Sequence, residues 1–214
     1  MHGLRRAVFL DRDGVINHNV WNPESGAFEA PLRPAQFALI PGVTRALRQL
    51  AHAGYLLFLV SNQPNYAKGK AEIDDPAVIH RLLMRQMKRA GISFTGCFYC
   101  FHHPEGVRGY GGTCLCRKPS PYFLLMAGRS FDLHLAESWM VGDRATDVAC
   151  GHAAGTRTIF VGSGHSCEPQ PHARARDLGE AAKLILHNDT VRTTTDRVLN
   201  GGLAMPARVA PDLR

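Results

Sequence analysis

Short apolar runs alternate with segments of helical periodicity along most of this chain. Residues 55–60, YLLFLV, are apolar at every position, which is typical of a strand buried on both faces of a sheet. Residues 42–53 instead place their apolar side chains at helical spacing. Repeated alternation of strand and helix favours a parallel sheet that is covered by helices. We therefore expect an α/β fold with a Rossmann-like, doubly wound parallel sheet and helices on both faces.

The predicted elements extend to residue 187. Strands are expected at residues 6–10, 55–60, 96–101, 137–141 and 156–161. Helices are expected at residues 42–53, 76–90, 121–131, 145–154 and 177–187. The remaining residues lose this periodicity and are rich in Thr, Asp, Arg, Gly and Pro. We expect one domain over residues 1–187 and a poorly ordered C-terminal tail over residues 188–214.

The composition fits a soluble globular protein with an anionic partner. The chain has 214 residues and a formal net charge of +7, which suggests a phosphorylated small molecule, an acidic membrane surface or nucleic acid. It contains no Lys/Arg run and no known nucleic-acid motif, which argues against nucleic acid. The longest apolar run is far shorter than the roughly 20 residues of a membrane span. The N-terminal apolar patch runs directly into acidic residues, which argues against a signal peptide. We expect a monomeric, cytoplasmic protein without membrane contact.

Polar side chains follow the apolar runs at the points where the predicted strands end. Asp11 and Asp13 come directly after the first strand, and side chains two residues apart on an extended chain face the same side. Two carboxylates this close must share a proton or bind a cation, and Mg²⁺ suits such a site. Ser61, Asn62 and Asp143 follow later strands, and open parallel sheets bind their ligands at these carboxyl ends. The alternative, a surface turn that merely ends the first strand, does not account for this convergence.

A second cluster of metal-ligating residue types lies between residues 100 and 116. Cys100 and His102 precede a glycine-rich loop, and Cys114 and Cys116 follow it. Two such pairs supply four ligands for tetrahedral zinc, which would hold together a loop with little apolar surface to bury. His103 is an alternative imidazole ligand, and an exposed loop with incidental thiols is the alternative without a metal.

Four short motifs carry a resemblance to a known family. They are FLDRDGVIN at residues 9–17, VSNQ at 60–63, CRKP at 116–119 and VGDRATD at 141–147. In this order they resemble the haloacid dehalogenase superfamily of phosphohydrolases, over about residues 6–187. The cysteine-rich loop that runs into CRKP further resembles the heptose bisphosphate phosphatases and the histidinol phosphatase domain. The length of the chain leaves no room for a large cap domain.

The resemblance implies a mechanism through an aspartyl-phosphate. Asp11 would be the nucleophile, and Asp13 would protonate the leaving oxygen and then activate water. Lys118 would neutralise the charge of the transferring phosphoryl group. Catalytic Mg²⁺ would be held by Asp11, Asp143 and the backbone carbonyl of Asp13. Zinc would be structural, and the resemblance assigns it to Cys100, His102, Cys114 and Cys116.

The resemblance also implies contacts to the substrate. Ser61 and Asn62 would hydrogen-bond the phosphoryl group. Arg108, in the zinc loop, is a candidate for binding a second phosphate. Further substrate contacts are expected from Gln63, Lys68, Arg117 and Arg144.

These features predict a phosphatase that acts on a phosphorylated sugar or a similar small molecule. The leading hypothesis is removal of the 7-phosphate of D-glycero-D-manno-heptose 1,7-bisphosphate, in the biosynthesis of nucleotide-activated heptose for surface polysaccharide. Histidinol phosphate is the alternative substrate. A nucleic-acid end-processing phosphatase or binding protein is a third and weaker hypothesis.

Overall fold

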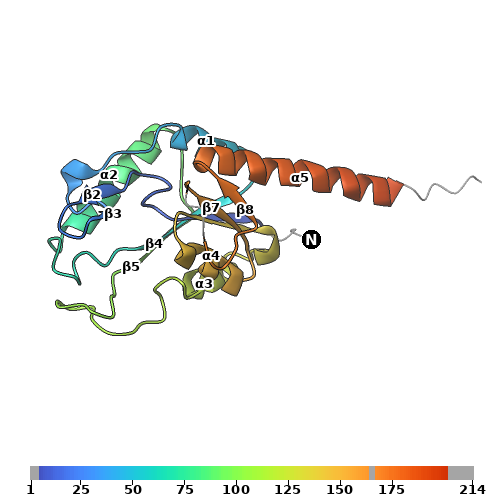
Figure 1. The fold of residues 1–214 in the computed structure, drawn as a ribbon. Coiled ribbons are helices and arrows are strands. Elements are labelled where there is room, and N and C mark those ends of the chain that lie inside the picture. Colours follow the sequence, from blue (N-terminus) through green and yellow to red (C-terminus); the bar gives the residue numbers. More distant parts are fainter. Residues whose placement is uncertain (1–4, 164–166, 202–214) are drawn as a thin grey trace, which may run out of the picture.

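A six-stranded sheet forms the centre of the computed structural model, which describes residues 5–163 and 167–201 (Figure 1). Every pair of neighbouring strands in it is parallel. In spatial order the strands are β5 (Gly96–Cys100), β4 (Leu56–Asn62), β1 (Ala7–Leu10), β6 (Trp139–Gly142), β7 (Arg157–Val161) and β8 (Ala173–Ala175). The predicted parallel α/β sheet is therefore confirmed.

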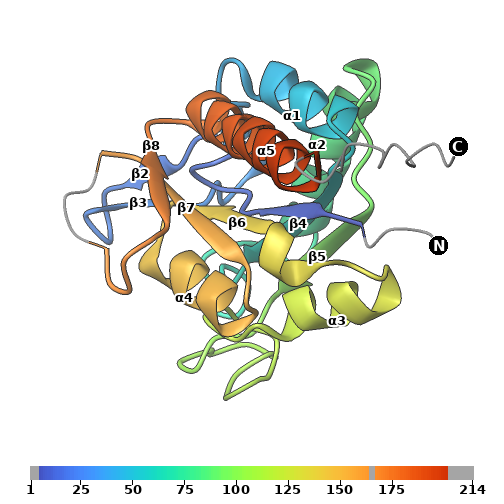
Figure 2. The same ribbon diagram turned by 90° about the vertical axis from the view of Figure 1, so that its right-hand side faces the viewer.

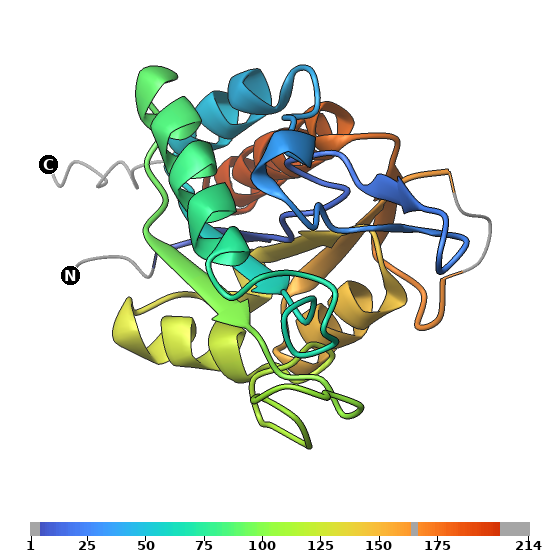
Figure 3. The same ribbon diagram turned by 90° about the vertical axis from the view of Figure 1, so that its left-hand side faces the viewer.

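Helices cover both faces of the sheet (Figures 2 and 3). One face carries α1 (Val43–His52), α2 (Asp75–Arg89) and α5 (Leu178–Gly201). The other carries α3 (Tyr122–Ser130) and α4 (Ala145–Ala153). None of the described helices is both long and apolar enough to span a membrane.

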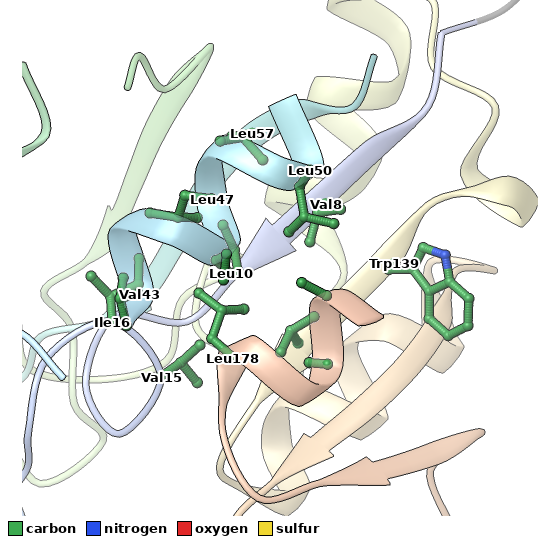
Figure 4. Close-up of a cluster of buried hydrophobic side chains, with 14 of the residues drawn as sticks. Val8, Leu10, Val15, Ile16, Val43, Leu47, Leu50, Leu57, Trp139 and Leu178 are labelled. Atoms are coloured by element: carbon green, nitrogen blue, oxygen red, sulfur yellow. The ribbon is translucent and has the colours of Figure 1, made fainter. Parts of the chain in front are cut away.

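The central strand β1 is buried on both sides. Val8 and Leu10 join the core under α1 and α5, and Ala7 and Phe9 join the core on the opposite face. Figure 4 shows leucines of α1 and α5 gathered with Val8 and Leu10. Because both faces are covered, the strand is apolar at every position and does not alternate.

A small hairpin and two 3₁₀ helices lie outside the predicted elements. The hairpin pairs β2 (Val20–Asn22) with β3 (Ala27–Glu29) antiparallel, and the 3₁₀ helices are η1 (Pro34–Gln36) and η2 (Leu135–Glu137). Strands of three residues are too short for a readable alternation of polar and apolar side chains. Between β1 and α1 the described chain contains this hairpin and η1 and no cap domain.

Helix α5 continues past residue 187, where the sequence analysis ends its last helix. The helix runs to Gly201, and Asp189 is tied to the domain core. Its carboxylate accepts hydrogen bonds from Arg6 at 2.6 Å and from the Tyr55 hydroxyl at 2.9 Å. The sequence after residue 187 has no apolar periodicity, so it gives no sign of this extension. Residues 202–214 of the predicted tail lie outside the described residues.

The packing of α1 predicts a large loss of stability for Leu47→Ala. Leu47 is fully buried in the core cluster that also contains Val8 and Leu10 of β1, so truncation removes apolar contacts and leaves a cavity. We expect the free energy of unfolding to fall by about 2–5 kcal/mol in urea denaturation. Gln49→Ala, at an exposed position of the same helix, is the control, with an expected change within about 0.5 kcal/mol. Equal effects of the two substitutions would contradict this packing.

Candidate active site

A cavity of about 240 Å³ opens at the carboxyl ends of the central strands. The site lies where β4 and β6 flank β1. At this point the strand order changes direction, and open parallel sheets bind their ligands there. The residues that line it come from every motif found in the sequence. Its polar lining consists of Asp11, Asp13, Glu29, Asn62, Asn65, Lys68, Arg117, Lys118, Arg144, Thr146 and Asp147.

Lys118 is the buried cation of the cavity. Its ammonium group lies 2.9 Å from Asp11 Oδ1 and 2.6 Å from Asp147 Oδ1, and it donates to the Val60 carbonyl at 2.8 Å. Burial alone would lower the pKa of Lys118, but the two carboxylates outweigh burial and raise it above its ordinary value. The lysine is therefore charged and lies beside Asp11.

Three carboxylates meet beside this lysine and could hold a cation. Oxygens of Asp11, Asp143 and Asp147 all lie within 4.8 Å of one another. Burial, reinforced by the neighbouring carboxylates, raises the pKa of Asp143 to about 7. Asp143 Oδ1 is buried without a hydrogen-bond partner among the described residues. An orphaned carboxylate oxygen and crowded negative charge fit the oxygen ligands that Mg²⁺ prefers.

Asp147 also belongs to this cluster, although it is not among the metal ligands that the resemblance implies. Burial raises the pKa of Asp147 to about 6 against the opposing effect of Lys118. Its second oxygen accepts from the Arg144 backbone at the start of α4, at 3.0 Å. The sequence does contain a sign of this role. Asp147 is the third residue of a helix, where a capping carboxylate is held in a fixed direction.

Gly14 permits the close approach of the turn after β1 and the Asp143 carboxylate. A Cβ atom at this position would lie 2.1 Å from Asp143 Oδ2, and its φ of +80° is the left-handed region that favours glycine. Asn19 then donates to the same Asp143 oxygen at 2.9 Å. Gly14 of the first motif thus leaves room for the Asp143 carboxylate of the last motif.

The structure separates Asp13 from the carboxylate cluster. Its side chain is not in the group formed by Asp11, Asp143 and Asp147, and it is bonded to Arg12, Asn17 and Gln63. The carboxylate of Asp13 nevertheless lines the cavity. It therefore lies at the cavity but outside the candidate metal position.

The predicted phosphate contacts divide into two groups. Lys68, Arg117 and Arg144 line the cavity, whereas Ser61 and Gln63 are buried behind its surface. Asn62 also lines the cavity, but its side chain pairs with the Lys118 backbone. It accepts from the Lys118 N–H and donates to the Lys118 carbonyl, both at 3.1 Å. The side-chain amide of Asn62 therefore holds the backbone of Lys118 in place.

Arg117 is anchored by the cysteine-rich loop. Its Nη1 donates to the His102 carbonyl at 3.1 Å while the residue lines the cavity. Arg108 is not part of the cavity lining, and its guanidinium carbon lies 5.8 Å from the centre of the Tyr66 ring. The loop therefore brings Arg117, and not Arg108, to the candidate site.

The cysteine-rich loop folds back so that four ligand atoms meet. Cys100 and Cys114 Sγ lie 3.6 Å apart, Cys114 and Cys116 Sγ lie 3.6 Å apart, and His102 Nδ1 is 3.6 Å from Cys116 Sγ. Tetrahedral zinc with Zn–S bonds of about 2.3 Å separates its sulfur ligands by roughly 3.8 Å. The cluster fits zinc.

His102, and not His103, joins the three cysteines. The group of close ligand atoms contains Cys100, His102, Cys114 and Cys116. His103 Nδ1 instead accepts from the Glu105 N–H at 3.2 Å. Burial raises the pKa of the Cys100 thiol to about 12 in the metal-free protein, so a bound cation is what would keep this thiol ionised.

Comparison with known proteins identifies the family. A family model described as HAD-hydrolase-like matches residues 115–187. The D-glycero-beta-D-manno-heptose-1,7-bisphosphate 7-phosphatase of Vibrio cholerae is 36% identical over 85% of this chain and 94% of its own length. The chain belongs to the haloacid dehalogenase-like phosphatases. The resemblance found in the four motifs is thereby confirmed, and the chain is a phosphatase.

Further relatives agree in length and fold. The D-glycero-D-manno-heptose-1,7-bisphosphate 7-phosphatase of Thermosynechococcus vestitus is 36% identical over 85% of this chain and 95% of its own length. Among solved structures, the D,D-heptose 1,7-bisphosphate phosphatase of B. bronchiseptica, complexed with magnesium and phosphate, matches with a TM-score of 0.71. It is 26% identical and covers 86% of this chain and 99% of its own.

The raised carboxylate pKa values predict pH-dependent stabilisation by Mg²⁺. A carboxyl whose pKa is higher in the folded state destabilises the fold as pH rises from about 4 through about 7. Deprotonation also frees the oxygens for metal. At about 100 times its Kd, Mg²⁺ should raise Tm by about 5–10 °C near pH 8 and by much less near pH 5.

Asp143→Asn is the matched control for this measurement. It keeps the size of the side chain but removes the charge that titrates, so the Mg²⁺-dependent rise in Tm should be small at both pH values. A wild-type rise that is equal at both pH values would contradict the involvement of Asp143.

The loop geometry predicts that zinc loss weakens substrate binding more than turnover. Cys114→Ser removes one ligand and releases the loop that anchors Arg117. We expect loss of bound zinc by elemental analysis and a KM raised by about 10-fold or more, with a smaller change in kcat. Cys97→Ser, outside the cluster, should retain zinc and KM. Full zinc content in Cys114→Ser would refute this assignment.

Proposed function

We propose that this protein hydrolyses the 7-phosphate of D-glycero-D-manno-heptose 1,7-bisphosphate and releases inorganic phosphate. The match over nearly the whole length of a heptose bisphosphate phosphatase is the observation that carries the proposal. The cavity supports it, because a buried lysine and carboxylates are combined there with surface cations. The monomeric state and the cytoplasmic location stay predictions from the sequence.

In the first step, Asp11 attacks the 7-phosphoryl group. An Asp11 carboxylate oxygen forms a bond to phosphorus while the bond to the sugar oxygen breaks. Asp13, in its protonated form, gives its proton to that oxygen, and heptose 1-phosphate leaves. A carboxylate nucleophile thus divides one difficult displacement into two easier ones.

In the second step, water regenerates the enzyme. Asp13, now ionised, accepts a proton from water as the water oxygen bonds to phosphorus. The bond between phosphorus and Asp11 breaks, and inorganic phosphate is released. The same carboxyl therefore serves as acid and then as base.

Charge neutralisation comes from the groups around Asp11. Lys118 lies 2.9 Å from Asp11 Oδ1 and would offset charge on the phosphoryl oxygens. We assign Mg²⁺ to Asp11, Asp143 and the Asp13 carbonyl, with Asp147 beside them. When bound, the metal supplies positive charge that stabilises the phosphoryl oxygens in the transition state. Zinc is assigned a structural role in the cysteine-rich loop.

The second phosphate of the substrate would meet the outer cations. Lys68, Arg117 and Arg144 line the mouth of the cavity, away from the buried Lys118. Burial lowers the pKa of Lys68, and the nearby Lys70, Arg117 and Arg144 lower it further. A bidentate arginine contact is well suited to a phosphate group.

A panel of phosphate esters tests the substrate. Both anomers of the heptose 1,7-bisphosphate and histidinol phosphate are compared by kcat/KM for phosphate release. We expect one heptose anomer to be preferred by at least about 100-fold over histidinol phosphate, since the latter lacks the second phosphate. Preferential turnover of histidinol phosphate would overturn the heptose assignment.

Asp11→Asn tests the nucleophile. An amide cannot form the phosphoenzyme, so kcat should fall by at least about 1,000-fold while the protein stays folded by circular dichroism. Asp74→Asn, an exposed acid at the start of α2, should leave kcat unchanged. Retained activity in Asp11→Asn would exclude the mechanism.

A further inference from the structure

Arg12, between the two catalytic carboxylates, is completely buried. Its exposed fraction is 0%, and it does not line the cavity. Its Nε and Nη2 donate to Asp13 Oδ1 at 3.1 Å and 3.0 Å, and Nη2 also lies 3.1 Å from Asp13 Oδ2. A guanidinium group presents its donors in a rigid, planar fork, so this pairing fixes the plane of the Asp13 carboxylate.

Gln63 closes the arrangement from the other side. Its Oε1 accepts from Arg12 Nη2 at 2.8 Å, and its Nε2 donates to Asp13 Oδ2. Because arginine offers only donors, the amide oxygen must face Arg12, and the amide nitrogen must then face Asp13. The orientation of the amide is therefore set by chemistry.

Both oxygens of Asp13 are held by this network. Oδ1 accepts from Arg12 and from Asn17 Nδ2, the latter at 2.9 Å, and Oδ2 accepts from Gln63 and Arg12. The donors come from the loop after β1 and from the end of β4. None of these donors belongs to the cluster of Asp11, Asp143 and Asp147.

The same amide also acts on Ser61. Gln63 Nε2 donates to Ser61 Oγ at 2.9 Å. A hydroxyl whose oxygen already accepts this hydrogen bond keeps its own proton free to donate. Gln63 thus directs the Ser61 proton elsewhere, and a phosphoryl oxygen at Asp11 would be an acceptor for it.

We propose that Gln63 and Arg12 are positioning residues that hold Asp13 where it can give its proton to the leaving oxygen. This inference rests on the proposed function, in which Asp13 is the acid and base. It reassigns Gln63, which the sequence analysis expected to contact the substrate. Gln63 is only 3% exposed, and its polar atoms are engaged by Arg12, Asp13 and Ser61.

The dependence of rate on the leaving group distinguishes this role from a merely structural one. A series of aryl phosphates is assayed, and log kcat/KM is plotted against the pKa of the leaving phenol. This constant reports the steps up to release of the phenol, so hydrolysis of the phosphoenzyme does not enter. Protonation of the leaving oxygen flattens the plot, whereas loss of the acid steepens it.

Gln63→Met is the principal variant, and Gln63→Glu is the second. Methionine removes the amide hydrogen bonds to Arg12, Asp13 and Ser61. Glutamate keeps the size but places an oxygen against Asp13. For both we expect a steeper plot than wild type. The loss should be about 10-fold or more for the poorest leaving group and less than about 3-fold for the best. A uniform loss across the series, or an unchanged plot in a folded variant, would overturn the proposal.

The Asp13→Asn background is the matched control. If Gln63 acts through Asp13, then Gln63→Met adds no further steepening once the acid is gone. Additional steepening in the double variant would refute the proposal. Phosphate release from heptose bisphosphate by the wild-type protein is measured separately. Failure of that assay concerns the substrate alone and is distinguishable from a wrong role for Gln63.

A crystal structure of Gln63→Met tests the same point if aryl esters are poor substrates. Because Gln63 braces both Arg12 and Asp13, we expect the Asp13 carboxylate and the Arg12 guanidinium to move together from their wild-type positions. An Asp13 side chain in the wild-type position would contradict the proposal.

Discussion

The buried charge of Lys118 is the constraint around which this active site is assembled. Its ammonium group is almost completely removed from water and is balanced by Asp11 and Asp147. Removal of one partner from a buried ion pair costs about 3–5 kcal/mol, because the remaining charge is uncompensated. The three residues come from the end of β1, from α4 and from the segment after the cysteine cluster. The same contacts therefore join the sheet to the loop and supply charge for phosphoryl transfer.

The rim of the cavity is built from loops that are tied to one another. Glu29 of the hairpin pairs with Lys70 at 2.8 Å, and the Ala67 carbonyl accepts from the Val107 N–H at 2.8 Å. The cysteine-rich loop then holds Arg117 through the His102 carbonyl. Short loops, each held by one or two contacts, can in this way form an ordered rim around the cavity without an inserted cap domain.

Most of the fold and part of the site could be predicted from the sequence. The strand at residues 55–60 and the helix at residues 76–90 follow from their apolar patterns, and both appear with shifts of a residue or two at their ends. Asp11 and Asp143 were found because strand ends converge. The contacts of Gln63 with Arg12 and Asp13 could not be predicted from the sequence. They join the loops after β1 and β4, which are distant in sequence, and no local pattern of residues signals such a contact.

The contact between α5 and the base of the sheet has a consequence for shortening this protein. Asp189 is the acceptor for both Arg6 and the Tyr55 hydroxyl. A chain that ends at residue 187, where the apolar periodicity stops, lacks Asp189. The partly buried side chains of Arg6 and Tyr55 would then lose this hydrogen-bond acceptor. A shortened chain that is meant to keep this contact must therefore extend beyond Asp189.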